Sequence, residues 1–170
     1  MKPFLISLTL LAAAAANAEN PISNDTKMVW GIANNDIVKA AEKMPEESYA
    51  FKPSHDVRSF AQLVGHASDA AYMFCSAANS EQKAPMNIEK EKSSKADLVA
   101  AAKAAVAYCN AIYSGMTDAK GAEMVKFFGG DRTRLGVLNF NNAHTMEHYG
   151  NMVTYMRIRG IVPPSSEPRR

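Results

Sequence analysis

The chain has 170 residues, of which 47% are hydrophobic and 21% are charged, with 9 glycines and 8 prolines. This composition is typical of a single globular domain and excludes a disordered or fibrous protein. The 19 basic and 17 acidic side chains leave a formal net charge of only +2, which excludes a broad electrostatic surface for nucleic acid. We therefore expect no nucleic-acid partner.

Residues 1–18 have the pattern of a secretory signal peptide. Lys2 precedes an apolar run over residues 4–16. The small residues Ala16 and Ala18 then form the pattern that precedes a cleavage site. The apolar run is too short for a comfortable membrane span, which argues against an uncleaved anchor. We expect cleavage after Ala18 and an exported protein, periplasmic or secreted, without stable membrane insertion.

The sequence beyond this segment predicts an all-α fold, because apolar residues recur at spacings of three and four and no strict alternation indicates a sheet. The first helix is predicted to begin near Asn24 to Thr26, whose side chains can cap it, and to end at Pro45. A connector over residues 45–53 has two prolines and no helical period. The second helix is predicted over about residues 57–79.

Two further helices are predicted in the second half of the chain. A polar loop over residues 80–92 precedes Ser94, which with Asp97 resembles a capping box at the start of a helix ending near residue 116. A glycine-rich connector then leads to a helix over about residues 133–159. Four helices of about twenty residues, each about 30 Å long, bury their apolar stripes economically as a four-helix bundle.

The loop over residues 80–92 bears on the topology of this bundle. It is long enough to return along the whole bundle, so the second and third helices can run parallel in an up-down-down-up order, although loop length alone does not require this. We assign residues 19–164 to the bundle and residues 165–170 to a polar tail.

The last helix contains the one concentrated group of chemically active residues, a pair of histidines. His144 and His148 lie about 40° apart on a helical wheel, at the edge of the apolar arc. His66 in the second helix also borders the apolar face and falls at about the same height in an oppositely directed neighbour. Three neutral imidazoles can form an open site for one divalent metal ion.

Other interpretations of the histidines stay open on this evidence. Core histidines that are hydrogen-bonded to neighbouring hydroxyls would explain the pair equally well, and His66 could be a lone polar residue at a helix border. His55 precedes the second helix in a turn sequence, and we expect it to be solvated.

A peptidase motif competes for the same residues. The run from His144 to His148 matches the H-x-x-E-H pattern of inverted zinc peptidases, in which Glu147 would be the general base. Such enzymes need a further acidic ligand downstream, where only Glu167 remains. Glu147 also lies towards the polar face of the helix, which favours a solvated role.

Four motifs occur in order along the chain: Met44-Pro45-Glu46-Glu47, Val57-Arg58-Ser59-Phe60 leading to His66, the run from His144 to Arg157, and Gly160-Ile161-Val162-Pro163-Pro164. With these motifs the sequence resembles the DinB-like four-helix bundles, including the subgroup named for YfiT. The resemblance spans residues 22–164. It implies an up-down-down-up bundle whose metal ligands are His66, His144 and His148.

The resemblance also implies a class of activity. We expect one divalent metal ion, with zinc, nickel and iron as candidates, and a metal-dependent hydrolase or thiol transferase that acts on a small-molecule substrate. A cytoplasmic thiol would be scarce outside the cell membrane, which argues against the transferase in an exported protein. Asp69 and Asn141, each one turn from a histidine, are candidate substrate or supporting groups.

The main alternative function is a non-catalytic bundle that binds metal, or holds a small ligand under Trp30, Phe127 and Phe128. A bundle that binds no metal is a third alternative. The oligomeric state stays open between a monomer and a homodimer.

The two cysteines test the topology implied by the resemblance. Cys75 and Cys109 share a level only if the second and third helices run parallel, as in the resembled family. Two buried free thiols are the alternative. Because two cysteines in an exported protein meet an oxidising environment that favours disulfides, we predict a Cys75–Cys109 disulfide.

Overall fold

Four long helices dominate the chain in the computed structural model, which describes residues 19–81 and 86–168. The predicted signal peptide therefore lies outside the described residues. The long helices are α1 (Pro21–Lys43), α2 (Phe60–Ala78), α4 (Lys95–Ser114) and α6 (Arg134–Ile158).

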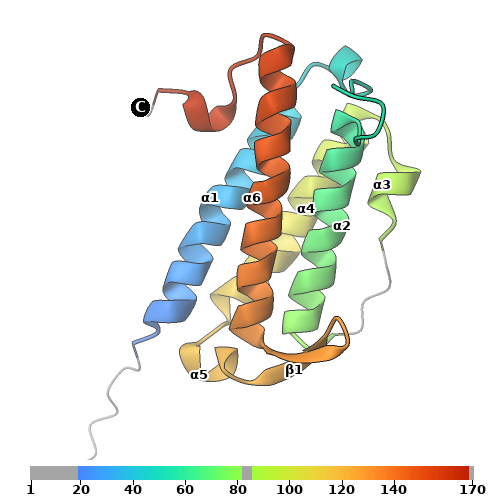
Figure 1. Cartoon of the computed structure of the whole chain (residues 1–170). Helices are drawn as coiled ribbons and strands as arrows, with labels where there is room; N and C mark the ends of the chain where they lie inside the picture. The colour runs from blue at the N-terminus through green and yellow to red at the C-terminus, as the bar shows by residue number, and fades with distance from the viewer. Residues whose placement is uncertain (1–18, 82–85, 169–170) are drawn as a thin grey trace, which may run out of the picture.

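The four long helices form an up-down-down-up bundle. Figure 1 shows α1 and α6 running in one direction and α2 and α4 in the other. Both α1 and α2 pack against α4 and α6, so α1 and α2 lie across the bundle from each other. The predicted all-α four-helix bundle is confirmed. None of the helices in the described part of the chain is both long enough and apolar enough to cross a membrane.

Two helices begin at other residues than the sequence predicted. Helix α1 starts at Pro21, and its free N–H groups at Ile22 and Ser23 donate to the carboxylate of Asp118, at 3.2 and 2.7 Å. Because Asp118 is so far along the chain, the residues around Pro21 contain no capping pattern that would predict the start of this helix. Helix α2 starts at Phe60 instead of residue 57, because Ser59 and Gln62 form a capping box there.

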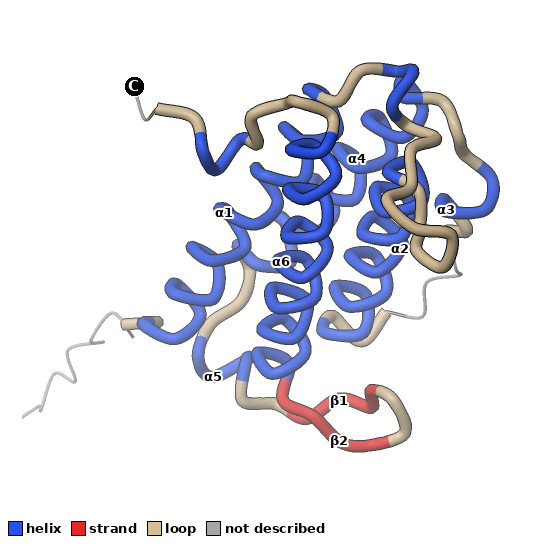
Figure 2. The backbone as a smooth tube through the Cα atoms, turned by 45° about the horizontal axis from the view of Figure 1, so that its top comes forward, coloured by secondary structure: helices blue, strands red, loops and turns tan. Residues whose placement is uncertain are grey.

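Short elements occupy regions that were predicted to be irregular. The loop over residues 80–92 contains the one-turn helix α3 (Ile88–Glu91). The glycine-rich connector contains α5 (Asp118–Gly121) and the antiparallel strands β1 (Met124–Phe127) and β2 (Gly130–Thr133). Figure 2 shows this hairpin at the end of the bundle where α6 begins.

The hairpin follows from its two turn residues, which both have positive φ, 48° at Phe128 and 74° at Gly129. This pair of angles matches the twist of the flanking strands and is typical of a two-residue hairpin turn. Each strand has only four residues, too few for an alternating pattern to be recognised in the sequence.

The core lies between the four long helices and is tied by one covalent link. Trp30 of α1 stacks on Tyr113 of α4 with the ring centroids 5.0 Å apart. Cys75 of α2 and Cys109 of α4 form a disulfide with their Cα atoms 5.5 Å apart. This link requires the parallel arrangement of α2 and α4, because the two cysteines are at matching heights only in that arrangement.

The segment after α6 turns back onto the bundle. A 3-10 turn, η2 (Pro164–Ser166), packs against α1, and Tyr149 donates a hydrogen bond to Ser165 at 2.8 Å. Glu167 forms an ion pair with Lys43 at the end of α1. The start of the predicted polar tail is therefore part of the folded structure.

Candidate metal centre

The contact between α2 and α6 brings three histidines together. One ring nitrogen from each of His66, His144 and His148 lies within 4.8 Å of the others. The His66 ring centroid is 5.2 Å from that of His144 and 4.7 Å from that of His148. The Nε2 atoms of His144 and His148 are 3.1 Å apart. The three residues expected to act together are thus within reach of one bound ion.

The hydrogen bonding of the pair on α6 does not match ordinary core histidines. Among the described residues, the buried Nδ1 atoms of His144 and His148 have no hydrogen-bond partner. Their Nε2 atoms face each other, and two neutral imidazoles can place only one N–H between them. The alternative of core histidines held by hydrogen bonds to neighbouring hydroxyls therefore does not describe His144 and His148.

The surroundings of this pair favour neutral imidazoles. Burial, together with the nearby His144, His66 and Arg58, lowers the pKa of His148 to about 4, despite the opposing charge of Glu89. Burial and His66 also lower the pKa of His144. A histidine must be neutral to bind a metal ion, and a set of three imidazole nitrogens suits zinc, nickel, iron or copper. The residues present therefore fit a divalent ion.

Glu89 of α3 is a neighbour of this cluster that the sequence did not reveal. Its carboxylate accepts a hydrogen bond from Nδ1 of His66 at 3.0 Å and one from Nε of Arg58 at 2.9 Å. Residues 66 and 89 are far apart in sequence, and 89 lies in a segment predicted to be a loop. The charged run over residues 89–92 gave no pattern that distinguished one carboxylate from its neighbours.

The two supporting residues suggested by the sequence have other contacts. Asp69 accepts hydrogen bonds from the backbone N–H groups of Ile88 and Glu89, both at 2.9 Å, and so holds α3 rather than facing a histidine. Asn141 is completely buried and donates to the hydroxyl of Tyr113 at 3.1 Å. Without exposed surface, Asn141 cannot contact a substrate that enters from solvent.

A pocket of about 710 Å³ opens beside the cluster, between α2, α6 and the connector before α2. This volume is within the range of about 300–1,000 Å³ that is typical of small-molecule sites. Its lining includes His148 and Glu147 of α6, Arg58 of the connector and Glu89 of α3. His55 also borders it, on the connector, with a side chain that is 99% exposed as expected.

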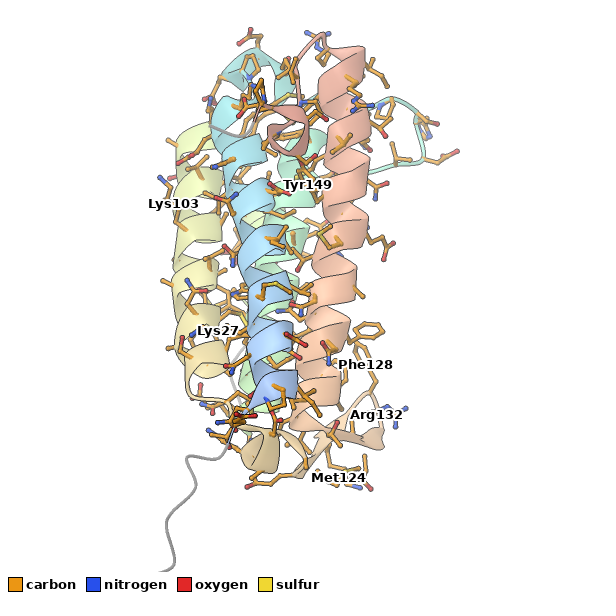
Figure 3. All side chains as sticks on the ribbon, turned by 90° about the vertical axis from the view of Figure 1, so that its left-hand side faces the viewer. Lys27, Lys103, Met124, Phe128, Arg132 and Tyr149 are labelled. Carbon is orange, nitrogen blue, oxygen red and sulfur yellow. A yellow bond between two sulfur atoms is a disulfide. The ribbon has the colours of Figure 1, made fainter. Side chains whose placement is uncertain are left out.

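The aromatic residues proposed to cover a ligand do not come together. Trp30 is buried against Tyr113, and its indole N–H donates to Asn110 at 2.8 Å. Phe127 and Phe128 instead pack on Phe74 of α2, with ring centroids 5.3 and 6.3 Å away. Figure 3 shows Phe128, in the turn of the hairpin, beside the lower part of α6. The prediction that Trp30, Phe127 and Phe128 together cover a small ligand is therefore wrong.

The acidic ligand that an inverted zinc peptidase needs is not at the histidines. Glu167, which the motif would need as its downstream acid, pairs with Lys43 near the end of α1. Glu147 is exposed on the wall of the pocket.

The match to known proteins covers most of the bundle. Residues 32–152, which include all three histidines, match the family model of the DinB superfamily. The chain belongs to the DinB superfamily. It is 25% identical over 123 residues to the protein YjoA of Bacillus subtilis (strain 168), and this match covers 71% of this chain and 79% of YjoA.

Two crystal structures share the fold. A DinB-like protein from Bacillus cereus ATCC 10987 superposes with a TM-score of 0.72 at 18% identity, covering 83% of this chain and 95% of that one. The DinB-like protein YjoA from Bacillus subtilis superposes with a TM-score of 0.68 at 21% identity, covering 86% and 100%. At these identities the likeness shows the fold, and the chemistry has to be argued from the site.

Proposed function

We propose that this protein is an exported metal-dependent enzyme that acts on a small molecule, with a hydrolase favoured over a thiol transferase. The observation that carries the proposal is the set of three histidine nitrogens within 4.8 Å of one another, with His148 on the wall of the pocket. In this proposal His66, His144 and His148 bind one divalent ion. An ion held in this way supplies Lewis acidity, which activates a bound water or thiol or polarises a carbonyl.

The chain's own residues supply the rest of the proposed site. Tyr155 donates a hydrogen bond at 2.7 Å to the carbonyl of Arg58 and so fixes the connector that forms one wall of the pocket. Glu147 also lines the pocket, where its exposed carboxylate can contact a bound substrate. A substrate in the pocket would therefore lie between groups that orient it and the histidine cluster.

Two features support an exported location. Residues 1–18 have the composition of a signal peptide, and the Cys75–Cys109 disulfide is typical of an oxidising compartment. Small thiols are scarce in such compartments, which is why the hydrolase is the favoured reaction.

Metal stoichiometry tests the proposed ligands. We expect the purified protein to bind about one divalent ion per chain, and we expect His144→Ala to abolish most of that binding, because two imidazoles hold an ion much more weakly than three. His55→Ala is the matched control, since His55 is exposed and lies outside the cluster. Elemental analysis and titration with zinc measure both. Stoichiometric binding retained by alanine variants of all three histidines would show that the ligands are elsewhere.

Cobalt substitution separates an enzyme from a protein that only binds metal. A catalytic ion has an exchangeable position, so a small anion or thiol should shift the visible spectrum of the cobalt-loaded protein. A spectrum that no small ligand changes would instead favour the non-catalytic metal-binding bundle. The wild-type protein without cobalt, treated with the same ligands, is the control.

A further inference from the structure

We infer that Glu89 is a positioning residue of the metal centre, which fixes the ring of His66, and that Gly65 and Asp69 hold Glu89 in place. The inference rests on the metal site proposed above. It assigns a role to α3, a single turn of helix outside the bundle that packs chiefly against α2.

The contact between Glu89 and His66 selects one form of the imidazole. Oε2 of Glu89 is 3.0 Å from Nδ1 of His66, and an ionised carboxylate can only accept, so Nδ1 carries the proton. The lone pair is then on Nε2, which is the His66 nitrogen left to bind an ion. In metal sites such a carboxylate orients the ring and raises the basicity of the ligand.

The carboxylate of Glu89 is itself held on its other side. Its second oxygen, Oε1, accepts from Nε of Arg58 at 2.9 Å. Each carboxylate oxygen of Glu89 therefore has one partner, and the side chain is only 24% exposed. Rotation of Glu89 away from His66 would break the pair with Arg58.

Two residues of α2 fix the backbone of Glu89. Both carboxylate oxygens of Asp69 accept from successive N–H groups, those of Ile88 and Glu89, at 2.9 Å each. At Gly65 a Cβ atom would lie 2.6 Å from Cα and 2.9 Å from the backbone nitrogen of Glu89. Glycine is therefore required at residue 65, because any side chain there would push α3 and its carboxylate away from the residue that follows, His66.

Zinc affinity and the protonation pattern of His66 test this role. We expect Glu89→Ala to weaken zinc binding about 10- to 100-fold, the usual loss for such a partner, while Glu91→Ala on the exposed side of α3 leaves affinity unchanged. Glu89→Gln keeps an acceptor oxygen for Nδ1–H and should recover part of the loss. Competition with a chromophoric chelator measures the affinities.

Gly65→Ala tests the same role without altering any polar group. The added methyl group should displace α3 and weaken zinc binding, whereas Gly31→Ala, where a Cβ meets nothing within 4 Å, should have no effect. Circular dichroism and urea unfolding check that the variants remain folded.

A second measurement does not depend on bound metal. Long-range ¹H–¹⁵N spectra of the metal-free protein should show His66 protonated at Nδ1 in the wild type and a shift towards Nε2 protonation in Glu89→Ala. The inference is overturned if wild-type His66 is protonated at Nε2, or if Glu89→Ala and Gly65→Ala bind zinc within twofold of a wild type that binds it. A wild type that binds no zinc but shows the Nδ1 form would overturn the metal site alone.

Discussion

His148 is the residue whose protonation most constrains the cluster. Its ring is only 6% exposed, and it faces His144, His66 and Arg58, so an added proton would be poorly solvated and repelled. The same burial that makes the imidazole a good ligand also makes the folded protein sensitive to acid. In the metal-free protein this sensitivity can be measured directly.

We expect the metal-free protein to lose stability as the pH falls from 7 towards 4. The folded-state pKa of His148 is lowered to about 4 from the usual 6.5, so between these values the unfolded chain binds more protons than the folded one, and the free energy of unfolding decreases. Urea unfolding at pH 7 and pH 5, together with an NMR titration of each histidine, measures this. A His148 resonance that titrates near 6.5 would contradict the prediction.

The three histidines could be predicted from the sequence, but their neighbours could not. Helical spacing places His144 and His148 on one face, and a count of turns puts His66 at the same height. Glu89 and the true role of Asp69 depend on where a loop of the chain returns, which local periodicity does not encode. A glycine that permits contact, such as Gly65, has no distinguishing signal in a single sequence.

At the scale of elements, the hairpin contains an unusual backbone conformation. Phe128 has a φ of 48° and a side chain that is 70% exposed, so it occupies the left-handed region without the burial that would offset the cost. Its ring nonetheless contacts those of Phe74, Phe127 and Phe140. The sequence identified the exposed aromatic pair but not the strands that present it, because β1 and β2 are too short to show a period.

Replacement of Phe128 by a residue suited to this conformation should stabilise the protein. We expect Phe128→Asn to raise the free energy of unfolding by up to about 1 kcal/mol, because asparagine tolerates the left-handed region and an ordinary residue pays about 1–2 kcal/mol there. Phe128→Ala, which removes the same ring but keeps a residue disfavoured in the left-handed region, should give no such gain. Denaturant unfolding measures both variants. A loss of more than about 1 kcal/mol in Phe128→Asn would mean that packing of the ring outweighs the strain.

For the whole molecule, the covalent link between α2 and α4 is the feature with the largest expected effect on stability. The disulfide joins residues separated by 34 positions. A loop of this size restricts the unfolded chain by about 3–4 kcal/mol in the chain-entropy model. The parallel helices could be predicted from the resemblance and the loop length, but the segment between them, with α3, could not.

Removal of the disulfide should therefore reduce stability strongly without changing the fold. We expect Cys75→Ala combined with Cys109→Ala to lower the free energy of unfolding by about 3–4 kcal/mol, apart from the packing lost at two buried sites. Urea unfolding of the oxidised wild type and the double variant measures this, with the double variant in reductant as the control. Mass spectrometry after unfolding without reductant should detect no alkylated cysteine, and two alkylated thiols would contradict the disulfide.

The up-down-down-up order also affects how the chain reaches its native state. Antiparallel neighbours joined by a tight turn can pair locally, but α2 and α4 are parallel, so their contact requires the intervening chain to return along the bundle first. The entropy of this closure is lost before any contact compensates for it, which slows folding. Once Cys75 and Cys109 are oxidised, the two helices stay tethered even in the denatured chain. Refolding of the oxidised protein then omits this search, and the segment that forms α3 folds within a loop that the disulfide has already closed.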